Sequence, residues 1–188
     1  MQVSGEYELQ ASRDVVWQKL NDPQVLQQCI PGCESLQATG ENAFSAVVKA
    51  AIGPVKAKFN AGIELQDLVA PERYTIVGNA KSGAAGFGKG SAQIVLHEAS
   101  DGTRLTYDAD LKVGGKLAQI GSRMVVGATR KTADDFFDAF AQIVNGPDTP
   151  PGIAAPDALP DNTAAGSTFW RYALIAVAIV IVIVFAAV

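Results

Sequence analysis

Hydrophobic and polar residues alternate with period two along most of the first 113 residues. This spacing is typical of strands with one buried face, and short turn-forming stretches such as Thr-Gly-Glu-Asn and Ser-Asp-Gly separate the runs. Strands joined by such turns form an antiparallel meander. The predicted strands lie at residues 3–9, 34–40, 43–52, 55–68, 73–81, 90–98 and 103–113.

Three segments have helical patterns instead. Residues 11–20 and 21–30 form two short predicted helices, and Pro31-Gly32 ends the second in a type II turn. A longer helix is predicted over 116–144, because its apolar residues recur at a spacing near 3.6. The predicted apolar stripe contains Leu117, Ile120, Met124, Ala128, Phe136, Phe140 and Ile143.

The fold class that follows is α+β, with a seven-stranded antiparallel sheet wrapped around the long helix. A helix with one apolar stripe must bury it, and the concave face of the sheet is the available partner. Many inward strand positions are small, which allows either close packing of helix on sheet or an internal apolar pocket. These small inward residues are Ala46, Ala50, Ala57, Ala61, Gly78, Ala80, Ala92 and Ala109.

If the interior holds a pocket, the larger inward residues line it. We expect its rim, or a docking contact, at Ile30, Pro31 and Gly32, with Phe87 as a candidate gate. The predicted pocket residues are Phe59, Ile63, Tyr74, Ile94, Tyr107, Leu111, Met124, Phe136 and Phe140.

The chain beyond residue 145 has a different character. Residues 146–168 are rich in proline and lack aromatic side chains, which predicts a flexible linker. Residues 169–188 carry no charge after Arg171, and Trp170 and Tyr172 flank that arginine at the start of the segment. This pattern predicts a single-pass anchor in the cell inner membrane, with residues 1–145 as a domain on the cytoplasmic side. The N-terminal residues do not resemble a signal peptide.

Charge and cysteine content narrow the function classes. The formal charge is −4, and basic residues occur in the sequence only singly or in pairs, so nucleic-acid binding is not expected. Cys29 and Cys33 have C-x3-C spacing, which is one residue longer than thioredoxin-type redox sites require. With two cysteines and one histidine in the chain, a metal site is not expected either.

Other motifs carry little chemistry. Residues 83–90 nearly match a phosphate-binding loop, but Gly90 replaces the required hydroxyl and a strand pattern follows, so we expect a glycine-rich hairpin loop. His97 falls on the polar side of its strand, and Asp134-Asp135 fit a solvated helix face. We therefore do not expect an enzyme, since Tyr74 and Tyr107 are the main polar inward groups.

The order of elements resembles the helix-grip fold of the START-like superfamily. Within it, LNDPQVLQQCIPGCESL and GFGKGSAQIVL resemble the CoxG family of carbon monoxide dehydrogenase subunits, and the matching positions are Asp22, Pro23, Leu26, Ile30, Pro31 and Gly32. The resemblance implies a membrane-tethered accessory of a molybdenum hydroxylase such as carbon monoxide dehydrogenase. It also implies an apolar ligand, which we expect to be a non-covalently bound isoprenoid quinone.

Three hypotheses follow from the sequence. The first is a quinone- or lipid-binding carrier that also docks a redox enzyme. The second is a structural tether with a filled core, and the third is an enzyme such as the START-like cyclases and hydrolases. The volume of the interior and the polar groups that face it separate these hypotheses.

Overall fold

A computed structural model describes residues 1–146 of the chain, as seven strands and four helices. The strands are β1 (Gln2–Leu9), β2 (Cys33–Ala38), β3 (Ala43–Ile52), β4 (Val55–Val69), β5 (Arg73–Ser82), β6 (Gly86–Ala99) and β7 (Gly102–Gly114). The helices are α1 (Arg13–Leu20), α2 (Pro23–Cys29), α3 (Lys116–Gln119) and α4 (Ser122–Val144). The predicted anchor at 169–188, and the predicted linker after residue 146, lie outside the described residues.

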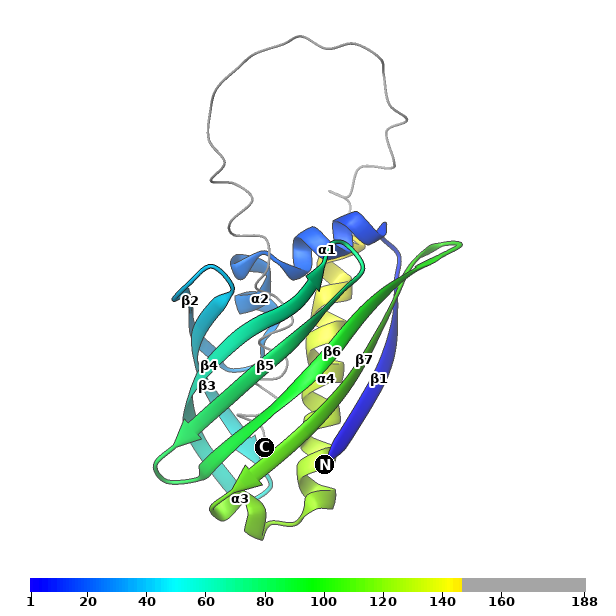
Figure 1. The fold of residues 1–188 in the computed structure, drawn as a ribbon. Coiled ribbons are helices and arrows are strands. Elements are labelled where there is room, and N and C mark those ends of the chain that lie inside the picture. Colours follow the sequence, from blue (N-terminus) through cyan, green and yellow to red (C-terminus); the bar gives the residue numbers. More distant parts are fainter. Residues whose placement is uncertain (147–188) are drawn as a thin grey trace, which may run out of the picture.

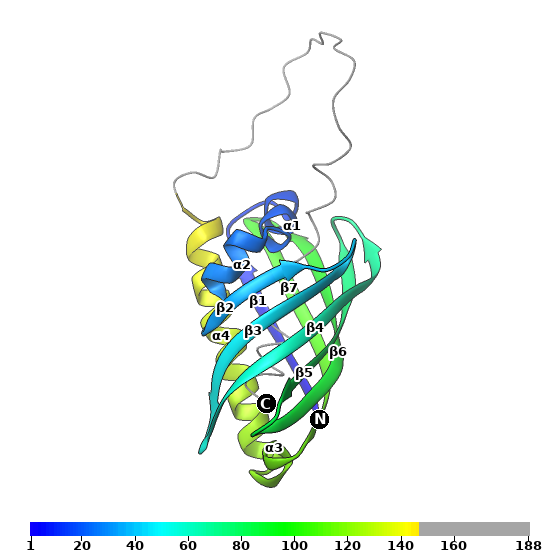
Figure 2. The same cartoon turned by 90° about the vertical axis from the view of Figure 1, so that its left-hand side faces the viewer.

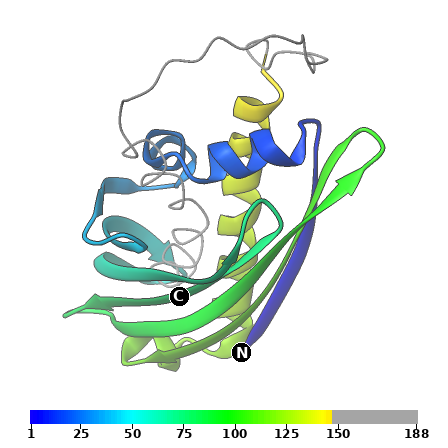
Figure 3. The ribbon, with the colours of Figure 1, turned by 45° about the horizontal axis from the view of Figure 1, so that its top comes forward.

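All seven strands form one antiparallel sheet in the order β1-β7-β6-β5-β4-β3-β2. Figure 1 shows the sheet curving around α4, and Figures 2 and 3 show the same arrangement from two other sides. The predicted α+β fold, a seven-stranded antiparallel sheet with a long C-terminal helix, is confirmed. Within residues 1–146, no helix is both long and apolar enough to span a bilayer.

The molecule has two ends, which we name after the short helices that lie there. At the α1 end are α1, α2, the β2–β3, β4–β5 and β6–β7 hairpins and the last turn of α4 (Figure 1). At the α3 end are α3, the start of α4 and the β3–β4 and β5–β6 hairpins (Figure 1).

The turn after α2 forms as its residue types require. The Asp22 side chain accepts a hydrogen bond from the Gln24 amide at the start of α2, and Pro23 occupies the first turn. At the other end, the Cys33 amide donates to the Ile30 carbonyl at 3.2 Å, and Gly32 has a φ of 74°. This is the predicted type II turn. The Gly32 carbonyl accepts from the Lys49 amide at 2.9 Å, so the turn is fastened to β3.

The predicted single helix over 116–144 is wrong in one respect. The chain breaks between α3 and α4 at Gly121, whose φ of 90° favours glycine and interrupts the helical hydrogen bonds. Because the break resets the helical phase, the face of α4 that is buried differs from the predicted stripe.

The glycine-rich segment also differs from the prediction of a loop over 83–90. β6 begins at Gly86, so most of that segment pairs with β5 and β7. Gly86 is paired with Ser82 and Gly88 with Ala80, in the regular register of the strands on either side. A strand at this place has no helix N-terminus to bind a phosphate, in agreement with our rejection of that motif.

Candidate ligand-binding interior

The inner face of α4 has two different halves. Toward the α3 end its buried residues are Val125, Thr129 and Ala133. Toward the α1 end they are three phenylalanines and Val144. Met124, which we predicted to line a pocket, has a side chain that is 48% exposed. Its sulfur lies against Gly53 at the β3–β4 hairpin, so the prediction that Met124 faces the interior is wrong.

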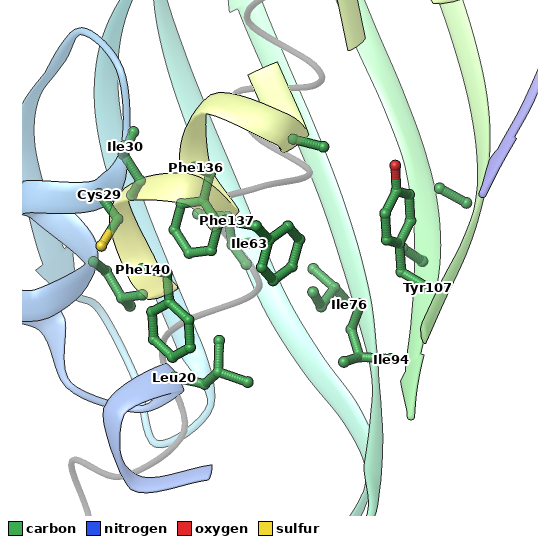
Figure 4. Close-up of a cluster of buried hydrophobic side chains, with 14 of the residues drawn as sticks. Leu20, Cys29, Ile30, Ile63, Ile76, Ile94, Tyr107, Phe136, Phe137 and Phe140 are labelled. Carbon is green, nitrogen blue, oxygen red and sulfur yellow. The ribbon is translucent and has the colours of Figure 1, made fainter. Parts of the chain in front are cut away.

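The half of the interior at the α1 end is filled by large side chains. Phe136 and Phe140 stack with ring centroids 5.9 Å apart, and Trp17 meets Tyr74 edge to face at 5.3 Å. Figure 4 shows the two phenylalanines between the helices at this end and the sheet, beside Leu20, Cys29 and Ile30. Aromatic pairs of this kind add to the free energy of burial, so this half stabilises the fold.

The half at the α3 end combines a row of small side chains with large ones near the β3–β4 hairpin, where Val48, Ile52 and Phe59 are fully buried. The strand register places Ala46, Ala61, Ala80 and Gly88 next to one another in a row across β3, β4, β5 and β6. Ala46, Ala61 and Ala80 are buried, as predicted for the inner face. On α4, the buried residues in this half include Thr129 and Ala133, and this helix approaches the sheet most closely at β1 and β3 rather than at the central strands.

The other predicted pocket residues all lie in the interior. Their burial fits both a pocket lining and a packed core, so their contact with a ligand stays a prediction. The buried members are Phe59, Ile63, Tyr74, Ile94, Tyr107, Leu111, Phe136 and Phe140.

The predicted rim residues divide into two groups. Ile30 is buried beside α4, and Pro31 and Gly32 form the exposed turn that follows it. Phe87 lies elsewhere: its side chain is 45% exposed on the outer face of the sheet, where its ring covers Gly114. The strand continues through Gly86, which puts Phe87 on the polar side of the alternation. The prediction that Phe87 gates the interior is therefore wrong.

A cluster of three rings joins β1 and β7 to α4. The Tyr7 and Phe137 rings stack with centroids 4.0 Å apart, and Tyr107 lies 6.4 Å from Phe137. The Tyr7 hydroxyl donates to the Asp134 carboxylate at 2.7 Å. Burial, and then this bond to a carboxylate, raise the pKa of Tyr7, and burial likewise raises the pKa of Tyr107. Both phenols are therefore neutral hydrogen-bond donors near pH 7.

Thr129 is one of three buried polar residues of the described domain that sequence reasoning missed, beside Asn21 and Thr103. Its side chain is 1% exposed, and its hydroxyl has no hydrogen-bond partner among residues 1–146. A buried hydroxyl without a partner costs about 1–3 kcal/mol, so such a group calls for an explanation. The sequence could have shown it only with the correct phase of α4, in which Thr129 lies one turn from Val125 and one from Ala133.

The two thiols are shielded from solvent to different degrees: Cys29 is buried and Cys33 is half-buried. Burial raises the pKa of Cys29 from 9.0 to about 11, and burial also raises the pKa of Cys33. Both are free thiols, and a protonated thiol is a poor nucleophile. The structure therefore supports the structural interpretation of this segment, in which the turn matters and the sulfur atoms do not.

The outer face of the sheet carries a hollow of about 460 Å³ over β1, β7 and β6. Its lining mixes the polar side chains of Glu6, Gln93, Thr106 and Asp108 with apolar surface that includes Val95. His97 is exposed on this face, 3.5 Å from the Thr106 hydroxyl, as the alternation predicted. In the described part of the chain, no cluster of histidine, cysteine and acidic residues could hold a metal ion.

Solved structures show the same fold. A conserved protein from Geobacillus kaustophilus is 36% identical, with a TM-score of 0.73, and the match covers 77% of this chain and 95% of that one. A START superfamily protein from Mycobacterium smegmatis is 17% identical, with a TM-score of 0.59 and coverage of 77% and 97%. Protein CV1439 from Chromobacterium violaceum is 16% identical, with a TM-score of 0.60 and coverage of 77% and 98%.

No curated protein sequence matches the chain. The model of the CoxG family, which describes a carbon monoxide dehydrogenase subunit, matches residues 5–145, nearly all of the described domain. The fold and this match agree with the resemblance seen in the sequence, and the fold is START-like. The chain belongs to the CoxG family of carbon monoxide dehydrogenase subunits.

Proposed function

We propose that this protein binds an isoprenoid quinone, or a similar apolar molecule, between the sheet and the α3-end half of α4. This proposal rests on two observations. Small side chains lie on both the sheet and α4 in this half, and the Thr129 hydroxyl has no hydrogen-bond partner within residues 1–146. The family and the START-like fold support hydrophobic ligand binding as the general function. What we propose beyond this general function is that the ligand is an isoprenoid quinone or a similar molecule.

The chemistry of a quinone suits such a site. Its isoprenoid chain is apolar and gains about 25 cal/mol for each Å² removed from water. Its ring carries two carbonyl oxygens, which accept hydrogen bonds but cannot donate them. The Thr129 hydroxyl can donate one such bond, which would satisfy a group that has no partner within the described residues.

We further propose that the protein couples a molybdenum hydroxylase, such as carbon monoxide dehydrogenase, to the membrane. Family membership supports this partner. Residues 169–188 would anchor the chain in the cell inner membrane, with Trp170, Arg171 and Tyr172 at the bilayer surface and the domain in the cytoplasm. In this arrangement the domain would carry quinone between the enzyme and the bilayer.

The test is mass spectrometry of an organic extract of the full chain, purified in mild detergent. The same extract from residues 1–146, loaded with added quinone and isolated again, controls for lipid that adheres to the anchor. We expect one quinone per protein in both samples. Its absence from both would contradict the proposal and leave a structural tether as the function.

A further inference from the structure

Basic residues gather at the α3 end, although the sequence shows only isolated lysines and pairs. Residues 49–58, 79–91 and 111–123 together contain eight basic side chains and no acidic one. These segments form the β3–β4 hairpin, the β5–β6 hairpin and the chain from the end of β7 into α4. Figure 1 shows all of them at the same end of the molecule.

The α1 end has the opposite character. Its hairpins, at residues 39–42, 67–73 and 97–102, carry five acidic side chains and a single basic one, Arg73. The acidic residues are Glu41, Asp67, Glu72, Glu98 and Asp101. The domain is therefore polarised from end to end, with its positive side around the β5–β6 hairpin and α3.

Two pairs of lysines stand directly opposite each other on the outer face of the sheet. Lys49 is the cross-strand partner of Lys58, and Lys89 is that of Lys112. Like charges in such positions destabilise a sheet. Glu34 relieves the first pair, with 2.6 Å contacts to both lysines. The second pair has no acidic partner within residues 1–146, because the nearby Asp110 is bound to the N-terminal amine.

Exposed apolar side chains lie at the same end. Of the three large hydrophobic side chains exposed in the described domain, Phe87 and Met124 are at the α3 end. Phe87 is the cross-strand neighbour of Lys81 on one side and of Gly114 on the other. An aromatic ring among lysines is typical of surfaces that contact a bilayer, where lysines meet lipid phosphates and the ring enters the headgroup layer.

We infer that the α3 end of the domain docks on a bilayer that contains anionic phospholipid. Charge complementarity carries this inference, since each lysine near such a surface contributes about 1 kcal/mol. The acidic α1 end would be repelled, so the domain would settle in one orientation. The inference extends the membrane side of the proposed function, but it depends neither on a bound ligand nor on the anchor.

The chain geometry permits this orientation. α4 ends at the α1 end, 23 residues from its start, a length of about 35 Å. The predicted linker over 146–168 could extend to about 70 Å. A domain held by such a linker can turn its α3 end toward the bilayer while the anchor stays inserted.

The experiment is sedimentation of residues 1–146 with lipid vesicles. The Geobacillus protein indicates that this domain folds alone, because the match covers 95% of that chain. We expect the domain to bind vesicles of phosphatidylcholine with one quarter phosphatidylglycerol, and not vesicles of phosphatidylcholine alone. The double variant Lys89→Gln, Lys112→Gln should bind about 30-fold more weakly, from about 1 kcal/mol for each lysine.

The matched control removes two charges from the α1 end, as Lys19→Gln and Arg73→Gln. This control should bind like the wild type, and Ala80→Leu should as well, since it alters only the interior. Equal binding to neutral and anionic vesicles would overturn the inference, as would an equal loss in the control. The inference would also be overturned if the domain bound neither kind of vesicle but was retained on heparin. None of these results depends on whether quinone binds.

Discussion

The two halves of the interior use the same sheet and the same helix in different ways. At the α1 end, Phe136 and Phe140 fill the space between α4 and the sheet, and Trp17 and Tyr74 extend this packing under α1. At the α3 end, a row of alanine and glycine crosses the sheet beside the buried Phe59, and α4 buries the smaller Thr129 and Ala133. If the α3-end half holds the proposed ligand, the fold concentrates its stability in the aromatic half and keeps small side chains where the ligand binds.

The largest expected effect comes from removing one large side chain from the packed half of the interior. Phe136→Ala removes a fully buried ring that contacts Phe137 and Phe140, and should lower the free energy of unfolding by about 3–5 kcal/mol. Urea denaturation of residues 1–146 measures this. Phe87→Ala is the control, with an expected loss below about 1 kcal/mol, because its ring is partly exposed. Equal losses would show that the packed half does not dominate stability.

The next prediction compares an alanine-to-leucine substitution in each half of the interior. Ala11→Leu, near α1, should cost about 1–3 kcal/mol of unfolding free energy because a packed core resists extra methylene groups. Ala80→Leu should change it by less than about 1 kcal/mol, since its row neighbours are Ala61 and Gly88. Denaturation curves of both variants in the absence of ligand measure the two changes in unfolding free energy. A cost at Ala80 as large as at Ala11 would mean that the α3-end half is also filled.

A smaller effect tests whether the Thr129 hydroxyl binds the quinone. Thr129→Val keeps the shape of the side chain but removes the hydroxyl, so quinone affinity should fall about fivefold, the value of one hydrogen bond of about 1 kcal/mol. Isothermal titration measures the affinity. Unfolding free energy in the absence of quinone should stay equal or rise, because the hydroxyl has no partner within residues 1–146. A variant that binds as tightly as the wild type would remove Thr129 from the site.

The smallest effect is a pH dependence that arises in the packed half. The pKa of Cys29 is raised to about 11 in the folded domain, from 9.0. The stabilisation from keeping this thiol neutral is complete below pH 9 and is lost as the pH rises toward 11. At pH 9.5 the loss should be about 1 kcal/mol. It is measured as the difference in pH dependence between the wild type and Cys29→Ala, and identical pH profiles would contradict it.

The sequence predicted the strands because each has one buried face. The runs at 43–52, 55–68, 73–81 and 103–113 match β3, β4, β5 and β7 within one residue at each end. Period-two alternation survives in these strands because one face meets the core throughout. The same alternation identified Ala46, Ala61 and Ala80 as inward residues before the register showed that they are neighbours. Gly88, predicted to lie in a loop, joins this row because β6 begins at Gly86.

What the sequence could not predict depended on backbone geometry at glycine or on the exact register between paired strands. The break at Gly121 shifted the buried face of α4 from Met124 to Val125 and Thr129. The continuation of β6 through Gly86 moved Phe87 to the outer face. The lysine cluster was hidden because Lys89 and Lys112 become neighbours only when β6 and β7 pair.

The most direct test of the central claim is the affinity of Ala80→Leu for a quinone with a single isoprenoid unit, measured by isothermal titration beside the wild type. The account predicts that the wild-type domain binds and that the leucine lowers the affinity at least tenfold, because it occupies the space of the ligand. Equal affinity in the two proteins would contradict the proposed site. Absence of binding to the wild type would contradict quinone as the ligand.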